Sequence, residues 1–116
     1  MIKRATIPMP ALFLLIPPPA AIPGFGFVYI LQSADASLYI GQTRDVGERL
    51  RKHHYGLGSK FTRDHTAPRL VFCEGPMSLE AAVLREAQLK RWSRAKKEAL
   101  VAGDLRTLSD LSRARG

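Results

Sequence analysis

The sequence contains a single cysteine, Cys73, among 116 residues. One cysteine cannot form a disulfide within the chain and argues against a zinc cluster built on thiolates, so the count fits a reducing compartment such as the cytoplasm. No apolar run approaches the roughly 20 residues that a transmembrane helix needs. We therefore expect neither a disulfide scaffold nor a membrane span.

Acidic residues are also few, because 10 Asp and Glu stand against 18 Lys and Arg and leave a formal charge of +8. Hydrophobic residues make up 46% of the chain, which is too apolar for a disordered basic tail and enough for one modest core. Such an excess of positive charge on a small domain points to a polyanionic partner, most simply nucleic acid. The alternative at this point is that the charge only aids solubility.

Prolines are scarce after residue 24, since six of the eight lie before it. The apolar run 11–16 resembles part of a signal peptide, but it is shorter than the roughly 7–15 residues of an h-region, and prolines bracket it. The prolines at 17–19 favour extended backbone and block a helix. We interpret residues 1–24 as a poorly ordered extension, residues 25–102 as the folded domain and residues 103–116 as a short C-terminal helix and tail.

The folded part has the pattern of three strands and four helices. Runs rich in β-forming residues predict strands over 27–31, 38–41 and 69–74, with Gly75 and Pro76 closing the third. Capping residues predict helices over 45–55, 78–92, 93–103 and 104–114, with a basic loop over 56–68. This order predicts an α+β fold, a small three-stranded antiparallel sheet flanked by helices.

Two tyrosines ten residues apart stand in similar tripeptides on the first two predicted strands, Val28-Tyr29-Ile30 and Tyr39-Ile40-Gly41. Arg49 follows after ten further residues, and Arg85-Glu86 lies in the helix after the third strand. This ordered set resembles the GIY-YIG nuclease family, which is named after two such tripeptides on adjacent strands. The resemblance covers residues 25–102 and is greatest to the small stand-alone bacterial members. It implies a metal-dependent nuclease with the fold of that family.

The sequence departs from the family pattern at two places. The first tripeptide has Phe27 and Val28 where the family name has Gly and Ile, which is a common and minor change. Family members often carry an asparagine about twelve residues after the glutamate, where this chain has Glu98. Small stand-alone relatives usually lack that asparagine too, so its absence weakens the analogy with excision-repair nucleases more than it weakens activity.

The two tyrosines are cross-strand neighbours in the predicted hairpin, so the phenols of Tyr29 and Tyr39 can stand together on one face. A phenol has a pKa near 10, and nearby cations would lower that pKa and make the phenolate a usable base. Arg49, His54 and Lys60 are candidates for these cations. The alternative is that the tyrosines are packing residues and the bases are solvated.

The predicted helix 45–55, which carries Arg49, also contains two adjacent histidines, His53 and His54. Imidazole titrates near neutral pH and is the side chain most often used for proton transfer. Each histidine could be a proton-transfer partner or part of a basic helix face. We favour His54, which lies one turn plus one residue beyond Arg49.

Glu86 shares one predicted helix face with Leu79, Val83 and Leu89 and interrupts that apolar stripe. A carboxylate turned toward a core is costly unless it is paired or bound to a cation. One interpretation is a salt bridge to an internal arginine such as Arg49. The other is a ligand to Mg²⁺ (or Mn²⁺), which the resemblance implies and which needs only one or two carboxylates beside waters and phosphate oxygens.

Basic residues around these candidates are expected to form a phosphate-binding surface made of Arg44, Arg51, Lys52, Lys60, Arg63, Lys90, Arg91, Arg94, Lys96 and Lys97. Trp92, within the densest basic segment, is interpreted as a core residue. No helix-turn-helix or ribonucleoprotein motif is present, so recognition would depend on shape or strandedness rather than on base sequence.

The resemblance therefore implies an endonuclease for DNA repair or processing, located in the cytoplasm and at the nucleoid when bound to DNA. In this hypothesis Tyr29 or Tyr39 takes the proton of the attacking water through His54, Arg49 neutralises the phosphate oxygens, and Mg²⁺ on Glu86 stabilises the leaving 3′ oxygen. The alternative is a non-catalytic DNA- or RNA-binding module on the same scaffold. The sequence leaves open the oligomeric state and which tyrosine is the base.

Overall fold

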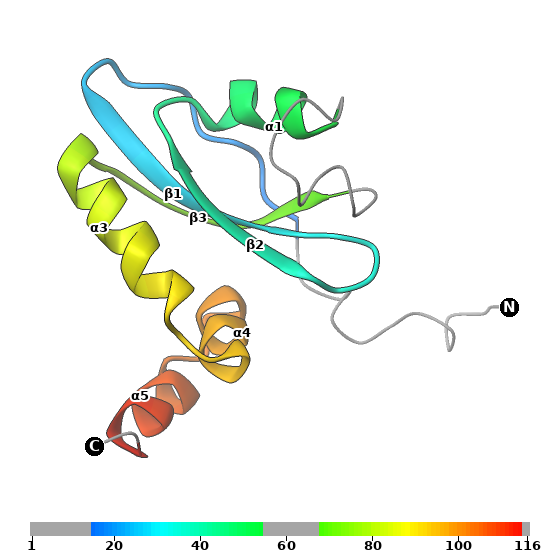
Figure 1. The fold of residues 1–116 in the computed structure, drawn as a ribbon, viewed down its shortest axis with the longest axis vertical. Helices are drawn as coiled ribbons and strands as arrows, with labels where there is room; N and C mark the ends of the chain where they lie inside the picture. The colour runs from blue at the N-terminus through cyan, green and yellow to red at the C-terminus, as the bar shows by residue number, and fades with distance from the viewer. Residues whose placement is uncertain (1–14, 55–67, 115–116) are drawn as a thin grey trace, which may run out of the picture.

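Three antiparallel strands form one sheet in the computed structural model, which describes residues 15–54 and 68–114 (Figure 1). Strand β1 (Phe25–Gln32) lies between β2 (Leu38–Thr43) and β3 (Arg69–Ser78). The helices are α1 (Val46–His54), α3 (Leu79–Lys90), α4 (Arg94–Ala102) and α5 (Leu105–Ala114). The predicted α+β class with a three-stranded antiparallel sheet is confirmed.

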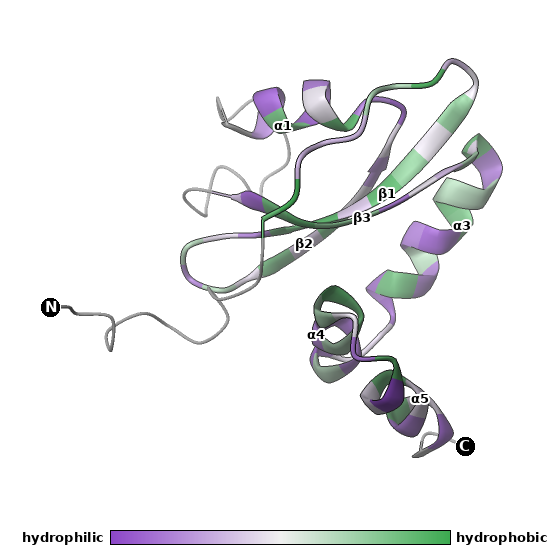
Figure 2. Cartoon of the chain, turned by 180° about the vertical axis from the view of Figure 1, so that it is seen from behind, coloured by the Kyte–Doolittle hydropathy of each residue, from purple (hydrophilic) through white to green (hydrophobic). Residues whose placement is uncertain are grey.

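Helices α1 and α3 cover opposite faces of the sheet, because alternate residues of β1 point to opposite sides. Val28 and Ile30 of β1 pack in one cluster with Leu89 of α3, whereas Tyr29 packs in a second cluster with Val46 of α1. Figure 2 shows β1 as mostly hydrophobic, while each helix carries both hydrophilic and hydrophobic residues. The central strand therefore supplies both halves of the core, and its tyrosine belongs to the half under α1.

Side-chain caps fix where the helices begin, as predicted. Oδ1 of Asp45 accepts a hydrogen bond from the backbone N–H of Glu48 at 3.0 Å, and the hydroxyls of Ser78 and Ser93 cap α3 and α4 in the same way. Gly103 ends α4 in the left-handed region, with φ of 73°. Over the two stretches that the structure describes, no helix has both the length and the apolar character needed to cross a membrane.

Strand β3 continues four residues beyond its predicted end at Glu74. Gly75 and Pro76 lie in a bulge, and pairing with β1 resumes at Met77, opposite Gly26. Proline lacks an N–H but is tolerated in an edge strand or a bulge, and β3 is an edge strand. Only glycine suits position 75, because its φ is 138° and a Cβ there would lie 2.9 Å from the carbonyl oxygen of Gly26.

The described part of the predicted extension, residues 15–24, contacts the sheet. The backbone N–H of Ile16 donates to the carbonyl oxygen of Leu70 in β3 at 3.2 Å, and the Ile16 side chain is half-buried in the cluster that contains Tyr29. The expectation of a poorly ordered extension does not hold at Ile16, because this apolar residue finds a partner surface and a backbone acceptor. Residues 1–14 lie outside the described residues, and the boundary at residue 24 stays a prediction.

Ile16→Ala tests this contact. We expect the change to lower the free energy of unfolding by about 1–2 kcal/mol, because part of an isoleucine side chain loses its apolar contacts. Leu15→Ala is the matched control, since Leu15 is 57% exposed and should cost less than about 0.5 kcal/mol. Urea unfolding of the full chain measures both. Equal stabilities for the two variants would show that Ile16 does not pack on the sheet in solution.

Candidate active site

The Tyr29 ring lies across the backbone of the neighbouring strand at Gly41. The two residues are register partners on β1 and β2. A Cβ on Gly41 would lie 2.5 Å from the phenol oxygen and 2.7 Å from Cζ of Tyr29, closer than any real contact. The glycine of the second tripeptide therefore makes room for the tyrosine of the first.

Three aromatic rings meet at this point. The phenol oxygen of Tyr29 lies 3.2 Å from Nε2 of His53, within hydrogen-bond distance. The ring centroids of Tyr39 and His53 are 5.2 Å apart, and those of Tyr29 and Tyr39 are 6.2 Å apart. Tyr29 is fully buried and His53 is 2% exposed, whereas Tyr39 is only partly buried. Tyr39 is thus the phenol of this group that solvent reaches.

The histidine at the tyrosines is His53, whereas the sequence favoured His54. His53 lies four residues after Arg49, so both belong to the same face of α1. The side chain of His54 lies outside the described residues. The sequence does contain a signal for His53, because residues four apart share one face of a helix and His53 lies four residues after Arg49.

Burial raises the pKa of Tyr29 well above its ordinary value of 10, and the neighbouring Tyr39 adds to this. Arg49 acts in the opposite direction, through its charge and hydrogen bonding, and the charge of Glu86 again raises the pKa. Arg49 lowers this phenol pKa as expected, but the cost of burying a phenolate outweighs the attraction of that guanidinium, so the pKa of Tyr29 is raised overall and the expected readily formed phenolate is not found at Tyr29. Tyr29 is a neutral phenol near pH 7.

The pKa of His53 is lowered below its ordinary 6.5, first by burial and then by the charge of Arg49. His53 is therefore a neutral imidazole near pH 7, with a ring nitrogen that can accept a proton. A guanidinium only donates, so the Tyr29 oxygen accepts from Arg49 and its own hydrogen is free to point at Nε2 of His53. Nδ1 of His53 is buried with no hydrogen-bond partner among the described atoms.

The thiol of Cys73, register partner of Tyr29 on β3, is not a nucleophile here. Burial raises its pKa to about 11, so it stays protonated at neutral pH. The chemistry of this site therefore belongs to the phenols, the imidazole and the charged groups around them.

Glu86 is partly exposed, with 22% of its side chain accessible, and its carboxylate lies 3.2 Å from Nζ of Lys90 one turn along α3. Its helix face is not the uniform apolar stripe that the sequence predicts, because Val83 is 50% exposed while Leu89 is buried. Among the ion pairs of the described residues, Glu86 pairs with Lys90 and not with Arg49. Its charge nevertheless contributes to raising the pKa of Tyr29.

The donor set at Glu86 suits a hard divalent cation. The described residues contain no group of three or more potential metal ligands from His, Cys, Asp and Glu, which excludes a protein-enclosed metal centre within them. Mg²⁺ instead binds one or two carboxylates and completes its shell with waters and substrate phosphates. A single accessible carboxylate whose present partner is an exposed lysine is compatible with that mode of binding.

Arg49 also lines an open cavity of about 290 Å³ together with Gln42, Thr43, Arg44 and Asp45. The cavity therefore joins the end of β2 to the start of α1. Arg44 is exposed there and Arg49 is half-buried, so two guanidinium groups share one hollow next to Tyr29. Such a hollow can hold a phosphate group.

The family model for the GIY-YIG catalytic domain matches residues 25–99. The chain belongs to the GIY-YIG family. It is 46% identical over 78 residues to a UPF0213 protein of Natronomonas pharaonis, which covers 67% of this chain and 92% of that protein. It is 45% identical over 76 residues to a UPF0213 protein of Halalkalibacterium halodurans, covering 66% and 81% respectively. The GIY-YIG family is one of endonucleases that typically use divalent metal ions, and the resemblance seen in the sequence is confirmed.

A solved relative belongs to the same group. The solution structure of a UPF0213 protein from Bacillus halodurans is 44% identical, covers 67% of this chain and 83% of that chain, and has a TM-score of 0.45.

The remaining basic residues predicted for this GIY-YIG domain divide into paired and unpaired cations. Ion pairs join Arg51 to Glu48, Lys90 to Glu86 and Arg94 to Glu98. Within the described ranges no ion pair is formed by Arg44, Lys52, Arg91, Lys96 or Lys97. Lys60 and Arg63 lie outside the described residues. The unpaired cations are the better candidates for binding phosphate, since no carboxylate has to be displaced.

Gly41→Ala tests the packing that assembles this site. We expect it to lower the free energy of unfolding by about 1–3 kcal/mol and to move Tyr29 away from His53, because a methyl group cannot fit beneath the ring. Gly47→Ala in α1 is the control: its Cβ would meet only Asp45 Oδ1 at 3.6 Å, and alanine should stabilise the helix by up to about 1 kcal/mol. Urea unfolding and near-ultraviolet circular dichroism measure the two effects. If Gly41→Ala is as stable as Gly47→Ala, the ring does not lie over position 41.

The buried His53 should make stability depend on pH. Its pKa is lower in the folded than in the unfolded chain, so the folded state binds fewer protons. The contribution of His53 to the free energy of unfolding is therefore fully present above about pH 6.5. It is lost as the pH falls from there through the folded pKa, by at most about 1.4 kcal/mol per pH unit. Urea unfolding at about pH 7.5 and pH 5.5 measures the loss, and His53→Gln should remove it. An equal loss in His53→Gln would assign the effect to another group.

Proposed function

We propose that this chain is a metal-dependent endonuclease that hydrolyses phosphodiester bonds in DNA, in repair or processing, within the cytoplasm and at the nucleoid when bound. The observation that carries the proposal is the buried hydrogen bond between Tyr29 and His53 beside Arg49. A neutral imidazole, a neutral phenol and a guanidinium are the groups that proton transfer and phosphate binding need.

The proton of the attacking water has a defined destination in this site. Tyr39 is partly exposed and therefore meets the substrate and its water, whereas Tyr29 and His53 are buried. The water oxygen bonds to phosphorus and its proton passes to Tyr39, whose own proton passes to Tyr29 as the proton of Tyr29 moves to Nε2 of His53. The bond between phosphorus and the 3′ oxygen breaks, the 3′ oxygen leaves with the electron pair and takes a proton from solvent, and imidazolium forms at His53. His53 thus replaces His54 in the hypothesis drawn from the sequence.

Arg49 and Arg44 bind the phosphate that reacts. Both line the cavity beside the phenols, and a guanidinium presents several donors to phosphate oxygens in a fixed plane. Arg49 is the closer of the two to the chemistry, because it acts directly on the pKa of Tyr29 and of His53. It neutralises the charge that develops on the non-bridging oxygens.

Glu86 is the residue that would hold Mg²⁺ or Mn²⁺. A divalent ion bound there supplies positive charge for the leaving 3′ oxygen. Lys90, the present partner of Glu86, is 55% exposed, and an exposed pair of this kind contributes little to stability, so the carboxylate can exchange it for a cation at small cost.

Glu86→Gln separates this proposal from a non-catalytic binding module on the same scaffold. We expect nicking of supercoiled plasmid in the presence of Mg²⁺ to fall by about 100-fold or more, because the charge that holds the metal is lost. DNA binding without metal should hold or improve, since one negative charge near the phosphates is removed. Glu80→Gln, an exposed carboxylate of the same helix, should nick at the wild-type rate.

The thermal stability of the same variants completes the test. Because Glu86 makes only an exposed i, i+4 pair, Glu86→Gln should unfold within a few degrees of the wild type. Metal-dependent nicking that persists in Glu86→Gln would remove Glu86 from the metal site. The absence of nicking in the wild type with Mg²⁺ and Mn²⁺, together with retained DNA binding, would favour the binding module.

A further inference from the structure

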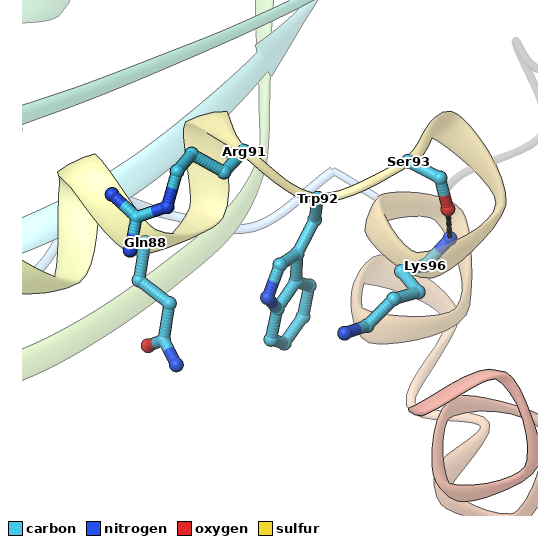
Figure 3. Close-up of a pocket in the computed structure, with 5 residues that line it drawn as sticks. All are labelled: Gln88, Arg91, Trp92, Ser93 and Lys96. Carbon is cyan, nitrogen blue, oxygen red and sulfur yellow. Dashed lines mark hydrogen bonds between the residues drawn. The ribbon is translucent and has the colours of Figure 1, made fainter. Parts of the chain in front are cut away.

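A second polar cavity lies at the junction of α3 and α4, away from the tyrosines. It has a volume of about 270 Å³ and is lined by Gln88, Arg91, Trp92, Ser93 and Lys96 (Figure 3). Trp92 packs against the cluster of Val28 and Ile30, on the face of the sheet opposite to Tyr29. We call these five residues the junction pocket. None of its side chains belongs to the group around Tyr29, Tyr39 and His53.

The two cations of the junction pocket have no carboxylate partner, unlike their neighbours. Lys90 and Arg94 pair with Glu86 and Glu98, but Arg91 and Lys96 form no ion pair within the described part of the chain. Two uncompensated positive charges line one polar hollow and make it attractive to an anion.

The Trp92 ring holds the ammonium group of Lys96 in place. Nζ of Lys96 lies 4.2 Å from the ring centroid, and Cζ of Arg85 lies 5.3 Å from it. Arg85 is itself fixed, because it donates to Glu74 at 2.7 Å and to Gln88 at 2.6 Å. Figure 3 shows the ring projecting between the α3 side chains and Lys96. Gln88 and Lys96 are therefore held in place before any ligand binds, which reduces the entropic cost of binding.

We propose that the junction pocket binds a backbone phosphate of the nucleic acid strand, at a position other than the one that is cleaved. Arg91 offers planar guanidinium donors and Lys96 a point charge, while the Gln88 amide and the Ser93 hydroxyl offer neutral donors. A polymer is favoured over free phosphate because unpaired cations elsewhere, such as Arg44, offer further contacts to the same strand. The proposal rests on nucleic acid being the substrate.

Position also favours a polymer that spans both sites. Arg94 donates to the carbonyl oxygen of Ala36 at 2.7 Å, which holds the start of α4 against the turn between β1 and β2. Tyr39 stands on β2 just after that turn. A strand bound at the tyrosines therefore has a second group of phosphate ligands at the same end of the hairpin.

Intrinsic fluorescence tests the junction pocket without any cleavage, because Trp92 is the single tryptophan of the chain. The full chain is titrated in EDTA with a duplex and a single strand of about 20 nucleotides, and binding is followed in parallel by the anisotropy of a labelled oligonucleotide. We expect oligonucleotide binding to change Trp92 fluorescence, because phosphate draws Lys96 from the ring. Lys96→Ala should reduce the slope of log K against log salt by about 0.9, the value for one lost phosphate contact on duplex DNA.

Two further variants keep the result interpretable. Arg106→Ala removes one exposed charge from α5, outside the pocket, and should leave the slope unchanged. Lys96→Gln retains most of the aliphatic stem on Trp92, so it should fold like the wild type and reproduce the reduced slope.

The possible failures are distinguishable. Oligonucleotide binding by anisotropy with unchanged Trp92 fluorescence and an unchanged slope in Lys96→Ala and Lys96→Gln would overturn the junction pocket and leave the proposed nuclease intact. A fluorescence change with millimolar inorganic phosphate but none with oligonucleotide would also overturn it, as a site for free phosphate. Failure of plasmid nicking in Mg²⁺ with these binding results in place would overturn the nuclease activity alone.

Discussion

The site depends on one steric constraint, the approach of the Tyr29 ring to a strand that has no side chain at Gly41. The ring can cross β2 only there, because a Cβ would occupy the space of the phenol oxygen. Once the ring is in that position, the phenol oxygen meets His53, and α1 must pack so that Arg49 and His53 face the sheet together. The register between Tyr29 and Gly41 thus fixes the relative position of the hairpin and α1.

Buried and exposed groups of the site differ in their charge. Burial keeps Tyr29 and His53 neutral, so each holds or passes a proton rather than a permanent charge. The permanent charges of Arg49 and Glu86 act on the pKa of Tyr29 with opposite sign, and Arg49 also lowers the pKa of His53. In the proposed function, the charged rim binds phosphate and the buried interior transfers protons.

Much of the fold follows from local sequence, and the candidate site follows in part. Capping residues such as Asp45 and Ser78 act within one turn, so they locate helix starts without tertiary information. Tyr29 and Tyr39 come together because hairpin register is also local. The choice between His53 and His54, in contrast, depends on which face of α1 meets the sheet.

Three further features depend on the tertiary surroundings of a residue, which the sequence does not display. The raised pKa of Tyr29 reflects the full enclosure of its ring, and charge counting alone gives the wrong sign. The extension of β3 past Pro76 depends on its place at the edge of the sheet. The partner of Glu86 depends on how far its helix face is covered, and the exposed Val83 shows that the cover is incomplete.

The contact of Ile16 with Leu70 affects how readily copies of the chain aggregate. An edge strand presents backbone groups to which a strand of another molecule can add, and this is a common route to aggregation. The N–H of Ile16 occupies one such acceptor on β3, and the prolines that follow it have no N–H with which to recruit a further strand. The proline-rich segment thereby covers the edge of β3 at Leu70 and disfavours the addition of another strand there.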